Sequence, residues 1–202
     1  LNLFIPSELD WAERSLAVTL DTAMPLAGSA TLTVRRAPRT AHAIAVRLPG
    51  WTQGANLTLN GEPASFAIHD GYAVVRRRWE AGDVIGVTLP MTLQAEPTPD
   101  DPATVAFTHG PLVLAADLGS ADAQFDGIGP ALIAPGMATA ALAAEGDGHF
   151  RATGALGEAL RLRPFFNQYD RRAAVYFRTF TPDGWASARE DYVRAAEASQ
   201  AL

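Results

Sequence analysis

The sequence contains no cysteine in its 202 residues. This absence excludes disulfide bonds, thiolate nucleophiles and cysteine-ligated metals, but it leaves the compartment open because disulfide-free proteins occur everywhere. No apolar run approaches the ~20 residues that a membrane-spanning helix needs, and the chain does not start with a basic segment followed by an apolar one. We therefore expect neither thiol redox chemistry nor a membrane partner.

Positive charge is scarce and comes from one residue type. Lys and Arg together number 16 against 22 Asp and Glu, which gives a formal net charge of -6, and every one of the 16 is Arg. A chain with this balance repels polyanions, so we exclude nucleic acid as a partner. The hydrophobic share of 48% is that of an ordinary globular protein, with room for one large or two small domains.

The first half alternates short apolar strands with turn signals. Residues 30–35 alternate with a period of two, which predicts a half-buried strand. Asn60-Gly61 suits the positive φ angles of a tight hairpin turn. Further strands are predicted at residues 15–20, 41–48, 56–59, 65–68, 71–79 and 84–89. This spacing is typical of an antiparallel β-sandwich.

The second half begins after a stretch, residues 96–102, that contains three prolines and is typical of a connection between packed units. Strands are predicted at residues 104–107, 112–116, 160–166 and 173–180, a long loop at 119–148, and a helix at 185–202. The predicted fold is mainly β: two antiparallel, jelly-roll-like β-sandwich modules with a short C-terminal helix. We assign residues 12–97 to the first module and 98–202 to the second, with a leading strand in 1–11.

No group of residues stands out as a catalytic or metal site. A glycosidase needs two carboxyl groups that face each other across a defined gap. The acidic pairs are Glu8 with Asp10, Asp100 with Asp101, and Glu190 with Asp191. We expect surface or turn roles for all of them. The four histidines are far apart and lack the spacing of a helix metal site. We therefore assign no catalytic, metal-binding or cofactor-binding residue.

Three aromatic residues, Trp51, Tyr72 and Trp79, are candidates for contact with carbohydrate, since exposed aromatic rings can stack on sugars. Burial in the sandwich core is the favoured alternative, because large rings are usually core anchors. The basic run Arg76-Arg77-Arg78 could grip a sugar acid. Neighbouring side chains on a strand point to opposite faces, however, so a solvated sheet edge is favoured for it.

Several motifs resemble one known family. They are Leu1-Asn2-Leu3-Phe4-Ile5-Pro6-Ser7-Glu8-Leu9-Asp10-Trp11, then Leu48-Pro49-Gly50-Trp51 with Asn60-Gly61, then Gly71-Tyr72 with Leu89-Pro90-Met91, and finally His109-Gly110-Pro111-Leu112-Val113. In this order they resemble the C-terminal β-sandwich region of glycoside hydrolase family 127, the β-L-arabinofuranosidase-like group formerly called domain-of-unknown-function family 1680. The resemblance covers about residues 1 to 116, and the tail is compatible with it.

The resemblance implies an N-terminal (α/α)6 barrel that carries the chemistry and is followed by two β-sandwiches. The family's catalytic Glu, nucleophilic Cys and Cys-containing zinc site lie in or beside that barrel, so no position of this chain receives them. The strand in residues 1–11 would be left from the barrel's exit, and its pairing with the second sandwich stays open.

The expected function is therefore that of a non-catalytic C-terminal portion of a bacterial glycoside hydrolase, inactive alone and bracing the absent barrel. The expected partners are that barrel and carbohydrate, with self-association through the apolar surface that the barrel would cover. A periplasmic or secreted location is favoured over a cytoplasmic one. The alternative is an autonomous carbohydrate-binding module, which requires two or three aromatic rings in an exposed, coplanar row.

Overall fold

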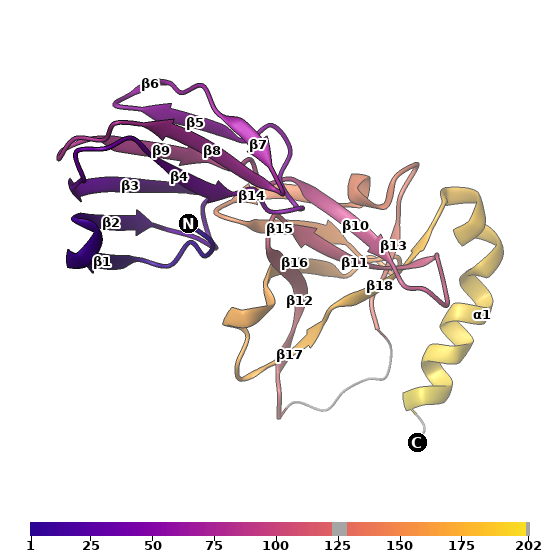
Figure 1. Ribbon diagram of the computed structural model, residues 1–202. Helices are drawn as coiled ribbons and strands as arrows, with labels where there is room; N and C mark the ends of the chain where they lie inside the picture. Colours follow the sequence, from indigo (N-terminus) through magenta and orange to yellow (C-terminus); the bar gives the residue numbers. More distant parts are fainter. Residues whose placement is uncertain (123–128, 201–202) are drawn as a thin grey trace. The chain divides into compact units, whose positions relative to one another are not determined.

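The computed structural model describes residues 1–122 and 129–200, which form two compact units, Leu1–Thr92 and Leu93–Leu202 (Figure 1). The chain is mainly β with antiparallel sheets and one C-terminal α-helix, so the predicted fold class is confirmed. The division falls after Thr92 rather than after residue 97. Strand β10 (Leu93–Pro97) pairs with β11 (Thr104–His109), so the start of the proline-rich stretch belongs to a sheet of the second unit.

The first unit is a sandwich of two sheets. The six-stranded sheet has the order β1 (Ser7–Trp11), β2 (Leu16–Thr22), β3 (Ser29–Arg36), β9 (Val84–Thr88), β5 (Asn56–Leu59) and β6 (Glu62–Pro63). The three-stranded sheet has the order β4 (His42–Arg47), β8 (Tyr72–Arg77) and β7 (Ala67–His69). A short 3-10 helix, η1 (Ala12–Arg14), joins β1 to β2.

Alternate side chains of both sheets close the core of the first unit. Leu32 and Val34 of β3 lie in one buried cluster with Val46 of β4 and Val75 of β8. Trp79, which is 2% exposed, completes this cluster. The strict in-and-out alternation of β3 is the pattern that the sequence displays over residues 30–35, because successive side chains of a strand point to opposite faces.

The predicted hairpin turn is confirmed at Asn60-Gly61, where both residues have positive φ. The returning strand is β6, with Thr58 opposite Pro63 and Leu59 opposite Glu62. A two-residue turn brings the chain back at once, so the predicted return at residues 65–68 is wrong. That segment instead enters β7, in the other sheet.

The leading strand belongs to the first unit. β1 runs antiparallel to β2, with Ser7 opposite Leu20 and Trp11 opposite Leu16, so the pairing with the second sandwich that the sequence left open is not what forms. Ahead of β1, the Leu1 backbone nitrogen donates to the Ala45 carbonyl, and the Arg47 amide donates to the Leu1 carbonyl. Leu1 thus bonds to β4 of the three-stranded sheet, whereas residues 7–11 pair with β2 in the six-stranded sheet.

The second unit is built on one branched sheet. Its main path is β13 (Ala131–Ile133), β18 (Tyr176–Phe180), β11, β12 (Leu112–Ser120), β16 (Ala159–Pro164), β15 (His149–Thr153) and β14 (Ala143–Gly146). β10 pairs with β11, and β17 (Arg171–Ala174) pairs with β12. The core of the second unit lies against one face of this sheet and includes Phe107, Leu114, Leu162 and Phe177.

Several predictions for the second unit need correction. The region 119–148 is not simply a loop, since it holds β13, the 3-10 turn η2 (Ala138–Ala141) and β14, while residues 123–128 lie outside the described part. β15 was not predicted. The predicted strand at 160–166 ends at Pro164 and continues as the 3-10 turn η3 (Phe165–Asn167). The predicted strand at 173–180 is divided between β17 and β18.

The C-terminal helix α1 (Pro182–Gln200) is confirmed, but it begins earlier than predicted, and residues 201–202 lie outside the described part. Pro182 suits a first helical position, and the Thr181 hydroxyl accepts a hydrogen bond from the Gly184 amide at 3.1 Å, so residues 182–184, whose Pro-Asp-Gly sequence predicts a turn, are instead the start of the helix. Trp185 and Tyr192 pack against Phe180 of β18. Within the described residues no helix has the length and apolar character to cross a membrane.

Candidate functional site

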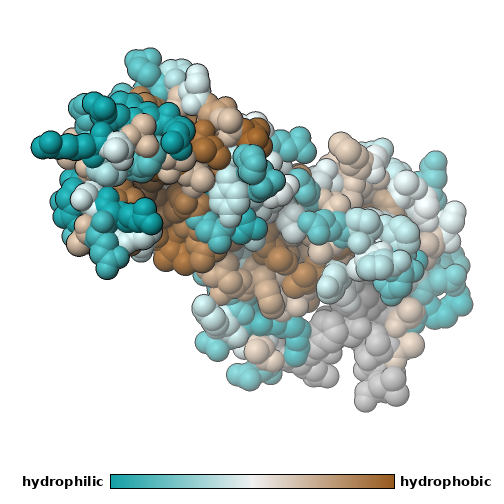
Figure 2. Space-filling view, viewed as in Figure 1, coloured by the Kyte–Doolittle hydropathy of each residue, from teal (hydrophilic) through white to brown (hydrophobic). Residues whose placement is uncertain are grey.

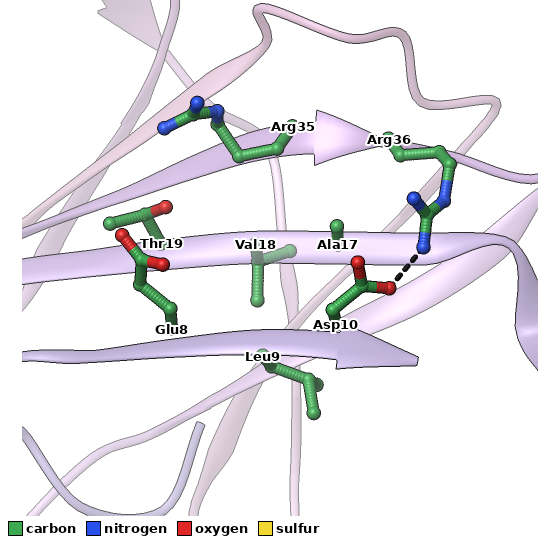
Figure 3. A pocket seen from close by; sticks show the side chains of 8 residues that line it. All are labelled: Glu8, Leu9, Asp10, Ala17, Val18, Thr19, Arg35 and Arg36. Carbon is green, nitrogen blue, oxygen red and sulfur yellow. Dashed lines mark hydrogen bonds and ion pairs between the residues drawn. The ribbon is translucent and has the colours of Figure 1, made fainter. Parts of the chain in front are cut away.

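A polar groove of about 290 Å³ lies over β1, β2 and β3 of the first unit (Figure 3). Its lining residues are Glu8, Leu9, Asp10, Ala17, Val18, Thr19, Arg35 and Arg36. The groove thus combines carboxylates, guanidinium groups and a hydroxyl, all of which form hydrogen bonds with polar ligands.

Strand geometry places these side chains. Glu8 and Asp10 are two residues apart on β1, so they point to one side while Leu9 points to the other (Figure 3). The β2–β3 register shifts between Ala17 and Val18, which pair with Arg36 and Val34. Arg35 is therefore the extra residue of a β-bulge, and bulges re-aim side chains. This shift brings two consecutive arginines to the groove.

The charges of the groove are only partly paired. Arg36 donates from Nη2 to the Asp10 carboxylate, with both side chains exposed. Ion pairs this exposed contribute about 0–1 kcal/mol. Glu8 and Arg35 make no ion pair with any residue in the part of the chain that the structure describes. A general acid for glycoside cleavage is held in a pocket that excludes water, whereas both acids here line an open groove. The arrangement suits binding better than catalysis.

A buried carboxylate, Asp83, links the turns of the first unit. Its Oδ1 accepts from Asn60 Nδ2 and its Oδ2 accepts from the Glu80 amide, each at 2.9 Å. Arg77 Nη2 lies 3.8 Å from Asp83 Oδ2. Burial alone would raise the pKa of Asp83, but these hydrogen bonds and the Arg77 charge outweigh it and hold the pKa below its usual value. The residue thus has a structural role.

The second unit has a comparable carboxylate, Asp117 of β12. Arg163 Nη2 donates to Oδ2 at 2.6 Å, and Arg171 Nε donates to Oδ1 at 2.9 Å. Burial raises the pKa of Asp117, while the Arg171 hydrogen bond, the Gly119 amide and the two guanidinium charges lower it, and the lowering is larger. Asp117 therefore ties β16 and β17 to β12.

The predicted carbohydrate contacts do not form an exposed row. Trp79 lies in the core and donates from Nε1 to the His42 carbonyl at 3.0 Å. Trp51 is half-buried and packs against the same core. Tyr72 is also half-buried, and its hydroxyl donates to Asn2 Oδ1 at 2.9 Å. Of the three, none offers a ring face that is fully open to a sugar.

The other acidic residues singled out from the sequence have local roles. Asp101 accepts from the Thr104 hydroxyl and the Ala103 amide, and these bonds lower its pKa. Asp191 forms an i,i+3 ion pair with Arg194 on α1. Across residues 1–122 and 129–200, no three His, Asp or Glu side chains gather closely enough to hold a metal ion.

The exposed aromatic residues are ones that the sequence reading did not select. Among the described residues they are Trp11, Phe165, Phe166, Tyr169 and Tyr176. Phe165 and Phe166 fall inside a predicted strand, where alternation would have buried one of them. The only available signal was the preceding Pro164, which ends the strand and turns both rings into the exposed connection.

Two comparisons relate the chain to known proteins. Residues 1–91 match the family described as beta-L-arabinofuranosidase, GH127 middle domain. No curated protein matches the chain. The matching solved structures include a GH127 beta-L-arabinofuranosidase from Geobacillus stearothermophilus T6, with a TM-score of 0.66 and 21% identity over 88% of this chain and 33% of that one.

Two further solved structures are similar. One, described as a glycoside hydrolase, has a TM-score of 0.60 and 22% identity over 85% of this chain and 34% of that one. The other, described as a GH127 beta-arabinofuranosidase, has a TM-score of 0.60 and 18% identity over 88% of this chain and 34% of that one. At these identities the likeness concerns the fold. This chain spans about a third of the length of each structure.

Proposed function

We propose that this chain is the non-catalytic β-sandwich portion of a glycoside hydrolase of the β-L-arabinofuranosidase type, where it braces a catalytic domain. The observation that carries the proposal is the match of residues 1–91 to a GH127 middle domain, together with solved relatives about three times as long. A middle domain by definition has neighbours in its chain, and the family resemblance implies that one of them carries the chemistry.

An exposed apolar surface on the first unit supports the bracing role. Leu3, Ile5, Leu9 and Trp11 are 45–60% exposed, and we call them the N-terminal apolar edge. Hydrophobic surface gathers beside the N-terminus (Figure 2). Leu9 and Trp11 share one side of β1, an edge strand whose outer backbone groups are unpaired in the sheet order. Exposed edges with large apolar side chains favour association.

The described residues also favour a non-catalytic role. Glu8 and Asp10, the acidic pair that lines the polar groove, are open to solvent, and Asp10 is already paired with Arg36. The buried Asp83 and the half-buried Asp117 are both committed to hydrogen bonds that hold the fold together. A glycosidase that works with two carboxyl groups needs one that retains a proton near neutral pH, whereas the pKa values of Asp83 and Asp117 are both lowered.

Activity and association together test the proposal. The chain alone should show no hydrolysis of 4-nitrophenyl β-L-arabinofuranoside above the uncatalysed rate, and turnover would contradict the non-catalytic role. Sedimentation velocity should show self-association that the Leu9→Ser/Trp11→Ser variant reduces. Ile68→Ser is the matched control, since Ile68 is 69% exposed on β7 of the same unit. An equal effect of the control would contradict the assignment to the apolar edge.

The alternative function is an autonomous carbohydrate-binding module, which requires exposed aromatic rings. The burial of its three predicted contacts speaks against it, because Trp79 is buried and Trp51 and Tyr72 are half-buried. A different set of exposed groups, in the second unit, favours a more limited binding role that would accompany bracing.

A further inference from the structure

One face of the second sheet carries a row of guanidinium groups, which we call the arginine face: Arg151 of β15, Arg161 and Arg163 of β16, and Arg171 of β17. Arg151 and Arg161 are directly opposite each other across the β15–β16 ladder. Their neighbours Phe150, Leu160 and Leu162 are buried in the core, so the arginines point away from it. Asp117 joins Arg163 to Arg171.

The arginine face has an excess of positive charge. Asp117 accepts hydrogen bonds from two of the guanidinium groups, and the neighbouring strand β14 contributes one carboxylate, Glu145, at its bulge. Arg151 and Arg161 make no ion pair with any residue in the described ranges, and both are exposed. Like charges directly opposite on a sheet are destabilising. A chain with a net charge of -6 nonetheless places positive charge together here, and an anionic ligand would relieve the repulsion.

Exposed aromatic rings adjoin this face. The connection from β16 to β17 runs from Phe165 to Asp170, and Tyr169 in it is 84% exposed. Gln168 anchors the connection, because its buried amide donates to the carbonyls of Ala115 at 2.9 Å and Arg163 at 3.2 Å. The connection that carries the rings is therefore fixed at Gln168, and along the chain it lies between Arg163 and Arg171. A held, exposed aromatic connection next to guanidinium groups suits a ligand with both a flat apolar face and an anionic group.

We propose that the arginine face and the Phe165–Asp170 connection together form a binding surface for carboxylate-bearing oligosaccharides, with guanidinium groups holding the uronate carboxylates and the aromatic rings stacking on the sugars. Arginine forms paired hydrogen bonds with planar carboxylates. A stack of apolar sugar faces on aromatic rings supplies the second contact.

A glycan fits this surface better than an acidic peptide does. Three aromatic residues within five positions are 44–84% exposed, and a peptide carboxylate needs none of them. The choice of glycan rests on the proposed function, since a glycoside hydrolase meets polysaccharides. The binding of carboxylate itself depends only on the arginine face.

The test measures binding of trigalacturonic acid to the 202-residue chain by isothermal titration calorimetry at low salt. Binding should be measurable, should weaken as salt is raised, and should be absent for the neutral galactose trisaccharide. The Arg151→Gln/Arg161→Gln variant should weaken binding by about tenfold or more, because each loses charge-assisted hydrogen bonds. Tyr169→Ala should weaken trigalacturonate binding too. The matched control is Arg76→Gln/Arg78→Gln, which removes the same charge from exposed positions of the first unit.

Folding is checked by the melting temperature, which Arg151→Gln/Arg161→Gln should raise because the opposed charges are removed. No binding of trigalacturonic acid, or an equal loss in the control variant, would overturn the proposal. Equal binding of a triglutamate peptide that is insensitive to Tyr169→Ala would overturn the assignment to a glycan. Hydrolase activity plays no part in this readout, so a failure of the proposed function would leave the binding result standing.

Discussion

The two units reach a buried core by different routes. The first has two separate sheets whose facing side chains meet, whereas the second has one branched sheet that encloses its core. The first uses antiparallel ladders that are regular except at the Arg35 bulge. The second adds a parallel pair, β13 with β18, and register shifts in two further ladders. Regular alternation can be read from sequence, and irregular pairing cannot, so the first unit is the more predictable one.

Each unit also holds one hydrogen-bonded carboxylate, buried Asp83 in the first and half-buried Asp117 in the second, but the two serve different elements. Asp83 links a β-turn to the Asn60 hairpin within a single unit. Asp117 holds two arginines of strands that pair with β12, and these arginines belong to the arginine face. The first carboxylate is only structural, whereas the second supports a surface that we propose to be functional.

The largest expected effect is the loss of stability when a buried aromatic side chain is removed from the core of either unit. Trp79→Ala should destabilise the first unit by about 3–5 kcal/mol and Phe107→Ala the second by a similar amount, because each empties a large buried site. Differential scanning calorimetry should show that each variant lowers chiefly the transition of its own unit. Tyr176→Ala, at a ring that is 60% exposed, is the control and should change little. A single transition that both core variants lower equally would contradict two separate cores.

A smaller effect compares the two carboxylates. Asp83→Ala should cost about 2–3 kcal/mol, because it leaves the Asn60 amide and the Glu80 N–H without their acceptor. Asp117→Ala should cost about 1–2 kcal/mol, since Arg163 and Arg171 can reach solvent. Urea unfolding measures both, with the exposed Asp21→Ala as control. A larger cost at Asp117 would reverse the comparison.

Lowering the pH should remove the stability that Asp83 and Asp117 contribute. The folded-state pKa values of Asp83 and Asp117 are lowered, so the unfolded chain takes up protons first as pH falls. The stability that these carboxylates contribute is complete above their ordinary pKa near 4 and is lost as pH falls below it through the folded-state values. Urea midpoints between pH 6 and roughly pH 3 should therefore fall more steeply in wild type than in Asp83→Ala. Parallel curves would contradict the role of Asp83.

The smallest effect compares two hairpin turns with the same backbone. Asn60-Gly61 and Asp147-Gly148 both have positive φ at each residue. Asn60→Ala should cost about 1–2 kcal/mol, because it adds strain and also removes bonds to Asp83 and to the Val84 amide. Asp147→Ala should cost about 1 kcal/mol or less, since only the strain applies. Chemical denaturation of the two variants decides the order, and a larger loss at Asp147 would contradict the account.

Much of the first unit could be predicted from sequence, because its strands alternate and its turns carry Asn-Gly or Asp-Gly. The polar groove could not be predicted, since it depends on the bulge that makes Arg35 an extra residue opposite Ala17. Ladder register is set by pairing between distant segments, and single strands do not display it.

The arginine face of the second unit could not be predicted from the sequence either, because it also depends on ladder register. Arg151 and Arg161 become neighbours only through the β15–β16 register, and β15 itself lies in a stretch with few strand-forming signals. The aromatic candidates failed for a related reason. Trp79 was recognisable as a large ring, but whether it faced the core or solvent depended on the sheet that closes over it.

The most direct test of the central claim is the intact mass of the natural protein that carries this sequence, measured from a fresh lysate of its source. The account predicts a species about three times the 21.4 kDa of this chain, because the chain covers 33% of a solved relative. A mature product of 21.4 kDa would contradict a bracing role within a longer glycoside hydrolase.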